Sequence, residues 1–107
     1  MTDLRDEELA LNVQNGDLAA FGTLVSRYEA KLLRYARKFL FSPEDGEDLV
    51  QDVFIKAYRN IQSFDTERSF SSWIYRIAHN EFINALKKKA RRPLVFFDLD
   101  AFFPQPK

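Results

Sequence analysis

The amino-acid sequence predicts an all-α fold, a compact bundle of about four helices. The chain has 107 residues, with only 3 glycines and 4 prolines to interrupt regular structure. Apolar residues recur at spacings of three and four positions almost throughout, which is the period of an amphipathic helix. A chain of this length can bury a core without disulfides, and it contains no cysteine that could form one. We therefore expect one cooperatively folded unit.

The first helix is expected to run from about Leu4 to Gln14. Asp3 is its predicted N-cap, because an aspartate side chain can accept a hydrogen bond from a free backbone N–H of the first turn. Asn15 and Gly16 follow, and glycine readily adopts the left-handed conformation that ends many helices. Asp17 can then cap the next helix.

The second helix is predicted from about Leu18 to Phe41. Its apolar residues alternate at spacings of three and four, which predicts a packing seam along one side: Leu18, Phe21, Val25, Tyr28, Leu32, Tyr35 and Phe39. The opposite side is basic and is most simply a solvated face: Arg27, Lys31, Arg34, Arg37 and Lys38.

The third helix is predicted from about Pro43 to Ile61. Ser42 is a preferred N-cap, proline fits the first helical position, and Asp45 stands three residues after the cap, as in a capping box. The inner arc of this helix is apolar: Leu49, Val50, Val53, Phe54, Ala57 and Ile61. The outer face is polar apart from one isoleucine: Asp48, Gln51, Asp52, Ile55 and Arg59.

A loop from Gln62 to Arg68 is expected to separate the third helix from the fourth, which Ser69 can cap. The fourth helix is predicted from about Phe70 to Arg92, where Pro93 ends it. Its inner arc is broad and apolar: Phe70, Ile74, Ile77, Ala78, Phe82, Ala85 and Leu86.

The outer side of the fourth helix carries an aromatic ring, an arginine, two amides and a run of bases: Trp73, Arg76, Asn80, Asn84, Lys87, Lys88, Lys89, Arg91 and Arg92. Rings and guanidinium planes stack on exposed bases, amides read their edges, and cations hold phosphates. This stripe therefore predicts binding to an unpaired nucleic-acid strand. Two other interpretations stay open, since Trp73 can equally belong to the core and cations are favourable at any helix C-terminus.

Charge is unevenly distributed along a chain whose formal net charge is zero. The segment from Glu44 to Asp52 holds five acids and no base, whereas the segment from Lys87 to Arg92 holds five bases in six positions. An acidic and a basic surface on one small domain suggest two different partners, although such charge runs are commonly solvated faces.

The sequence gives little sign of an enzyme, and we expect no catalytic residue, metal ion or cofactor. The single histidine, His79, lacks a Glu-x-x-His partner, and there is no glycine-rich phosphate loop. Asp48 and Asp52 share a helix face without a second ligating helix, so a helical metal-dependent enzyme remains only a weak alternative. The acidic start lacks the apolar run of a signal peptide, which favours a cytoplasmic protein without membrane insertion.

Several ordered blocks of residues resemble one family. The blocks Glu47 to Arg59, Phe64 and Phe70 to Asn80 strongly resemble the second conserved region of bacterial extracytoplasmic-function sigma factors. Gly16 to Phe21 and Leu24 to Tyr28 are similar to the opening of the same region. The resemblance spans roughly residues 5 to 93, and the order and separation of the blocks make it more specific than any single block.

The resemblance implies partners for both outer faces and a role in transcription initiation. It implies that the outer face of the third helix docks on the clamp helices of the beta-prime subunit of core RNA polymerase. It implies further that the loop from Ser63 to Arg68 and the fourth helix accept a flipped base and hold the non-template strand of the minus-ten promoter element as it melts. On this basis the predicted polymerase-binding residues are Asp48, Gln51, Asp52, Ile55 and Arg59. The predicted DNA-binding residues are Phe64, Trp73, Arg76, Asn80, Asn84, Lys87, Lys88 and Arg91.

The same resemblance divides the chain into a helical domain, residues 1–93, and an aromatic and acidic tail, residues 94–107. In the family such a tail begins the linker to a second domain that recognises the minus-thirty-five element. The other interpretation is that Phe96, Phe97 and Phe102 fold back on their own core. An alternative function, favoured by the aromatic tail and the zero net charge, is a sigma-like interaction module that an anti-sigma factor holds.

Overall fold

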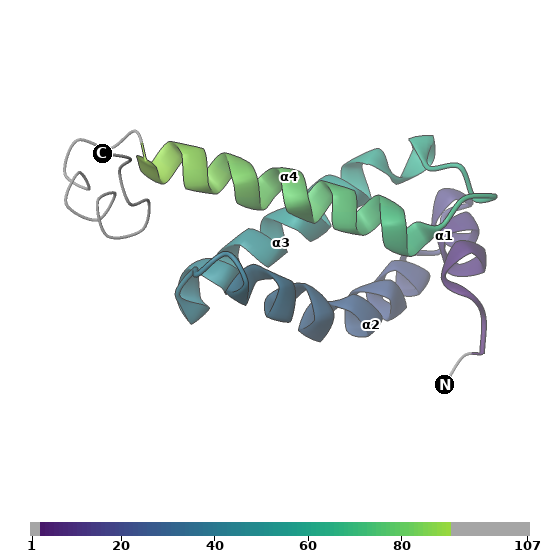
Figure 1. The fold of residues 1–107 in the computed structure, drawn as a ribbon. Helices are drawn as coiled ribbons and strands as arrows, with labels where there is room; N and C mark the ends of the chain where they lie inside the picture. Colours follow the sequence, from purple (N-terminus) through teal and green to yellow (C-terminus); the bar gives the residue numbers. More distant parts are fainter. Residues whose placement is uncertain (1–2, 91–107) are drawn as a thin grey trace.

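The computed structural model describes residues 3–90 of the chain, which fold into four α-helices and one short 3₁₀ helix (Figure 1). The elements are α1 (Asp6–Gln14), α2 (Leu18–Arg37), α3 (Pro43–Asn60), η1 (Ile61–Ser63) and α4 (Phe70–Ala90). No strand occurs within the described residues. The prediction of an all-α bundle of about four helices is confirmed.

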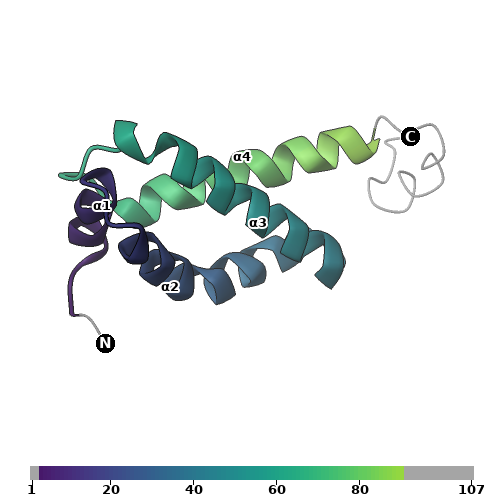
Figure 2. The ribbon, with the colours of Figure 1, turned by 180° about the vertical axis from the view of Figure 1, so that it is seen from behind.

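The three long helices form the body of the bundle, and α1 lies across one end of it. Figures 1 and 2 show α1 beside the start of α2 and the start of α4. The last turns of α4 reach the opposite end of the bundle, where α2 connects to α3. The start of α4 therefore lies beside the connection from α1 to α2, and its end lies beside the connection from α2 to α3.

The core is continuous and almost entirely apolar. No polar or charged residue of the described chain is buried, and the largest fully buried side chains are Phe70, Phe82, Leu24, Leu32, Ile61, Ile74 and Val53. The predicted inner arcs of α3 and α4 are confirmed, with Leu49, Ile77, Ala85 and Leu86 partly buried at their edges.

The predicted seam of α2 is partly wrong, because the helix is rotated about its axis. Leu18 is 64% exposed, whereas Ala20, Leu24 and Ala36 are buried together with Tyr28 and Leu32. The prediction followed the large apolar side chains and passed over alanine. Alanine matters here because α2 and α3 approach closely: a Cβ placed on Gly46 would lie 3.6 Å from that of Ala36. The larger residues Phe21, Val25, Tyr35 and Phe39 pack around the edge of the core.

Three of the predicted caps are present. Asp17, Ser42 and Ser69 each accept a hydrogen bond from a backbone N–H three residues ahead, at 3.3, 3.1 and 3.1 Å. Gly16 has the expected positive φ of 106°.

Asp3 is not the cap of α1, which begins at Asp6. Arg5 holds the N-cap position instead, and its backbone N–H donates to the Glu8 carboxylate at 2.9 Å. The second helix ends at Arg37 rather than Phe41, because the chain turns there and Leu40 adopts a left-handed φ of 65°. The predicted end of α4 at Arg92 and Pro93, and the tail of residues 94–107, lie outside the described residues.

Candidate functional site

The outer side of α3 is a charged surface with an apolar centre. We call it the α3 face and define it by five exposed residues: Asp48, Gln51, Asp52, Ile55 and Arg59. Ile55 is 48% exposed, and Tyr58, three residues further on, is 46% exposed and contacts Phe21 edge to face at 5.2 Å. Sequence reasoning missed Tyr58, although its spacing of three from Ile55 places the two side chains together on a helix.

The charged groups of the α3 face are available for a partner. Within residues 3–90, Asp48, Asp52 and Arg59 form no ion pair. Nearby, Lys56 forms an ion pair with Glu81 of α4 and so ties the two helices together beside this face. An apolar centre within a rim of charged groups is the usual composition of a protein–protein interface.

The outer side of α4 carries the predicted stripe, which we call the α4 stripe. Its members Arg76, Asn80, Asn84, Lys87 and Lys88 are all exposed, and Arg91 lies outside the described residues. From Trp73 to Lys87 the stripe is about 21 Å long, at the rise of about 1.5 Å per helical residue. Both amides and the lysines therefore face solvent along one continuous line.

The sequence left open whether Trp73 binds nucleic acid or belongs to the core, and its position fits both interpretations. Its ring packs on the core, with centroids 5.0 Å from Phe64 and 5.6 Å from Phe70. The residue is nevertheless only partly buried, and it lines an open hollow beside the start of α4.

This concavity, which we call the loop hollow, has a volume of about 870 Å³. It is lined by the loop between η1 and α4 and by the first turns of α4: Ser63, Phe64, Asp65, Glu67, Arg68, Ser69, Ser72, Trp73 and Arg76. It offers an aromatic wall together with the exposed guanidinium groups of Arg68 and Arg76. Stacking surfaces beside cations suit an unpaired base and its phosphate.

Phe64, one of the predicted DNA-binding residues, is largely buried at the base of the hollow. Its ring is only 5% exposed and packs edge to face on Phe70 at 5.6 Å. Phe64 therefore supports the hollow from inside the core instead of offering a free stacking surface. The polar residues on both sides of Phe64 in the sequence gave no sign of this burial.

The loop around the hollow is built from two local turns. The Ser63 hydroxyl donates to the Asn60 carbonyl at 2.7 Å, and the backbone N–H of Glu67 donates to the Asp65 carboxylate at 3.0 Å. A backbone bond from Arg68 to Asp65, at 2.9 Å, closes the second turn. These turns explain why the loop presents Arg68, which sequence reasoning had not chosen, at the rim of the hollow.

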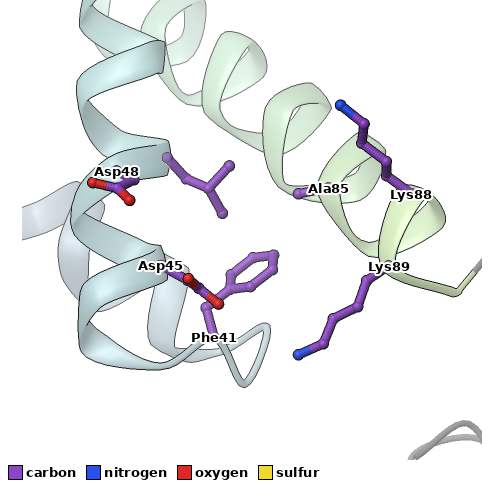
Figure 3. Close-up of a pocket in the computed structure, with 7 residues that line it drawn as sticks. Phe41, Asp45, Asp48, Ala85, Lys88 and Lys89 are labelled. Atoms are coloured by element: carbon purple, nitrogen blue, oxygen red, sulfur yellow. The ribbon is translucent and has the colours of Figure 1, made fainter. Parts of the chain in front are cut away.

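A smaller hollow of about 260 Å³ lies at the other end of the bundle, between α3 and α4. Figure 3 shows Asp45 and Asp48 on its α3 wall and Lys88 and Lys89 on its α4 wall, with Phe41 below. Asp48 belongs to the α3 face and Lys88 to the α4 stripe. The acidic and the basic surface therefore meet here, while the loop hollow lies at the far end of the stripe.

The junction of α1 with α2 holds a tyrosine whose pKa is raised, Tyr28. The Tyr28 hydroxyl donates to the Asp6 carboxylate, which also pairs with the Arg27 guanidinium at 2.8 Å. Burial, and then the hydrogen bond to Asp6, raise the pKa of Tyr28 from 10.0 to about 12. Tyr28 is thus a neutral donor at any physiological pH, and its role is to anchor α1.

Within residues 3–90, no His, Asp and Glu side chains form a group of three or more that could hold a metal ion. In the same range, no helix is both long and apolar enough to cross a bilayer.

Comparison with known proteins gives consistent matches. The model of the family described as sigma-70 region 2 matches residues 24–92. The ECF RNA polymerase sigma-E factor of Haemophilus influenzae is 47% identical over 90 residues, which are 84% of this chain and 47% of that protein. The ECF RNA polymerase sigma factor SigW of Bacillus subtilis is 40% identical over 88 residues, 82% of this chain and 46% of that protein. The chain thus spans about half the length of these curated relatives.

Two solved structures share the fold. An engineered region 2 of sigma-E, in complex with GTAAAA, superposes with a TM-score of 0.79 at 44% identity, covering 87% of this chain and 98% of that one. CnrH, in complex with the cytosolic domain of CnrY, gives a TM-score of 0.71 at 37% identity, covering 74% of this chain and 51% of that one. From the family match and these relatives we conclude that the chain belongs to the sigma-70 region 2 family, with sigma factors of the ECF class among its relatives.

Proposed function

We propose that this chain is the domain of a transcription initiation factor that binds core RNA polymerase and recognises and melts the minus-ten promoter element. One observation carries the proposal: the loop hollow, with its aromatic wall and arginines, opens at the start of an exposed stripe of amides and lysines. A structural neighbour that is 44% identical to this chain was solved in complex with GTAAAA. In this proposal the non-template strand follows the α4 stripe and one of its bases enters the loop hollow.

Melting by such a domain is a consequence of binding. A site that accepts an extruded base but not a stacked one shifts the duplex toward the open state. Extruding a base costs a few kcal/mol, and stacking on an aromatic side chain returns roughly 1 to 3 kcal/mol per base. Phosphate contacts with the lysines add to this. The domain breaks no covalent bond, so it acts as a binding protein and not as an enzyme.

The α3 face is proposed to dock on the clamp helices of the beta-prime subunit. The support is the combination of exposed Ile55 and Tyr58 with carboxylates that have no ion-pair partner among the described residues. The assignment to this subunit comes from the family resemblance. A role with core polymerase also places the proposed site of action in the cytoplasm.

Binding to short oligonucleotides tests the DNA part of the proposal. We expect the chain to bind single-stranded GTAAAA more tightly than an oligonucleotide of the same composition in permuted order, by fluorescence anisotropy at fixed salt. Both oligonucleotides carry the same charge, so phosphate contacts cancel in the comparison. Equal affinity for the two sequences would remove base recognition from the proposal.

A second candidate function is an interaction module that an anti-sigma factor holds. CnrH, which is 37% identical to this chain, was solved in complex with the cytosolic domain of CnrY. Affinity capture from a bacterial lysate separates the two candidates. Recovery of core polymerase subunits with the wild-type chain favours the initiation factor, whereas recovery of an inhibitor and never of polymerase favours the interaction module.

A further inference from the structure

Helix α1 holds the loop that forms the loop hollow, although α1 is far from it in the sequence. The side-chain amide of Gln14 donates to the Ile61 carbonyl at 2.7 Å and to the Phe64 carbonyl at 2.8 Å. The Gln62 side chain donates in return to the Gln14 carbonyl at 3.2 Å. One residue at the end of α1 thus fixes the backbone where the chain leaves η1 and enters the loop.

The other end of the loop is held by the same helix. The Glu7 carboxylate accepts a hydrogen bond from the backbone N–H of Phe70 at 2.8 Å. Phe70 is the first residue of α4 and is fully buried. A carboxylate at this position satisfies a free N–H of the first turn and is favoured by the helix dipole. Gln14 and Glu7 therefore bracket the loop at both of its ends.

Helix α1 has its own attachment to the bundle, independent of the loop. Leu9, Ala10 and Val13 are buried in the core, and Asp6 bonds to Tyr28 and pairs with Arg27 of α2. Other hydrogen bonds within the loop, such as those made by Ser63 and Glu67, join residues only two or three positions apart. Local bonds shape the turns, but the bonds from α1 fix their position relative to the bundle.

We propose that Gln14 and Glu7 are positioning residues for base binding, a role that rests on the function proposed above. They contact no DNA base themselves. They hold the loop from Ser63 to Ser69 against the start of α4, so that the hollow beside Trp73 exists before DNA arrives. A preformed site binds more tightly, because the entropy cost of ordering the loop is met during folding and does not reduce the free energy of binding.

The test replaces the amide donor of Gln14 by an apolar side chain of similar size. Gln14→Leu keeps helix propensity and removes the bonds to both carbonyls. The matched control, Asn12→Leu, makes the same change from amide to leucine on the same helix without touching those bonds. Affinity is measured for GTAAAA and for versions with an abasic site at each position in turn. The salt dependence is measured in parallel.

We expect Gln14→Leu to bind GTAAAA roughly tenfold more weakly than wild type, as for a site that must be ordered on binding. In wild type, an abasic site at the position whose base enters the hollow should lower the affinity. In Gln14→Leu this loss of affinity should be smaller, while the dependence of affinity on salt should be unchanged. Asn12→Leu should behave as wild type in both measurements. A purely structural role would lower the melting temperature and leave the abasic profile unchanged at temperatures where both proteins are folded. That unchanged profile would overturn the proposal.

Glu7 offers a second variant with a conservative rescue. Glu7→Gln keeps an oxygen that can accept from the Phe70 N–H and should retain most of the DNA affinity, whereas Glu7→Leu should lose it.

Amide hydrogen exchange of residues 64–69 gives a readout without DNA, and Gln14→Leu should accelerate exchange there more than in α3. Wild-type protection of the loop in Gln14→Leu refutes the positioning role. Failure of the wild-type chain to prefer GTAAAA refutes the proposed function instead.

Discussion

The α3 face and the loop hollow differ in the way the chain builds them. The α3 face consists of side chains from one regular helix, and each of them is exposed without supporting the core. The loop hollow draws on α4, the loop after η1 and bonds from α1, residues that are up to 63 positions apart. A surface of the first kind can change its side chains without changing the fold. A concave site of the second kind depends on packing throughout the bundle.

The largest expected effect tests whether the hollow rests on the core. Phe64→Ala removes a ring that is 5% exposed and packs on Phe70 and Trp73. We expect it to lower the free energy of unfolding by about 3 to 5 kcal/mol, the usual cost of emptying a buried phenylalanine site. Urea denaturation gives the value. A loss below about 1 kcal/mol would mean that the ring is not a core residue, and a direct contact of Phe64 with DNA would again be the better explanation.

A smaller effect tests how the Tyr28 hydroxyl anchors α1, through the way stability changes in alkali. The pKa of Tyr28 is about 12 in the folded chain, against 10.0 for an ordinary tyrosine. Between these values the unfolded chain has lost the phenolic proton and the folded chain keeps it, so stability falls as pH rises. Below pH 10 the contribution is fully present, and it is lost as the pH rises toward 12.

The variant Tyr28→Phe isolates this contribution. It lacks the hydroxyl, so its stability deficit relative to wild type should be largest below pH 10 and should narrow toward pH 12. Unfolding by urea at a series of pH values measures both proteins. A deficit that stays constant over this range would show that the hydroxyl titrates normally.

On the α3 face, a change should weaken binding without affecting the fold. We expect Ile55→Ala to reduce affinity for a beta-prime clamp-helix fragment about tenfold, as for a central interface residue, with unchanged urea midpoint and GTAAAA binding. Leu11→Ala is the matched control, since it truncates another half-exposed aliphatic side chain on a different helix, α1. Wild-type affinity of Ile55→Ala for the fragment would remove the polymerase assignment from the α3 face.

The smallest expected effects distinguish base reading from phosphate binding along the α4 stripe. Asn80→Ala should weaken GTAAAA and leave the permuted sequence nearly unchanged. Lys88→Ala should weaken both equally and reduce the salt slope by about 0.7, the value for one phosphate contact on a single strand. Lys38→Ala removes an exposed lysine that follows α2 and is not part of the α4 stripe, and it controls for net charge. If Asn80→Ala weakened both sequences equally, the amide would have no base-reading role.

The sequence predicted what depends on local chemistry. Caps at Asp17, Ser42 and Ser69 and the inner arcs of α3 and α4 follow from short-range spacing, and the structure confirms them. The α3 face and the exposed part of the α4 stripe were located in the same way. Their assignment to polymerase and to DNA remains a proposal.

What the sequence could not predict depends on close approach and distant contacts. The rotation of α2 follows from the contact of Ala36 with Gly46, two small residues that carry little signal in an apolar pattern. The bonds made by Gln14 join segments about 50 positions apart, beyond any helical period. The left-handed φ of Leu40 was also not predicted, because the position holds a leucine and not the glycine that usually adopts this conformation.

The most direct test of the account is a chemical-shift titration of the isotopically labelled chain with single-stranded GTAAAA. The account predicts the largest amide shifts at Ser63 to Ser69 and along α4 from Trp73 to Lys88, with little change at Ile55 and Arg59. Shifts centred on the α3 face, or the same pattern and strength with the permuted oligonucleotide, would contradict it.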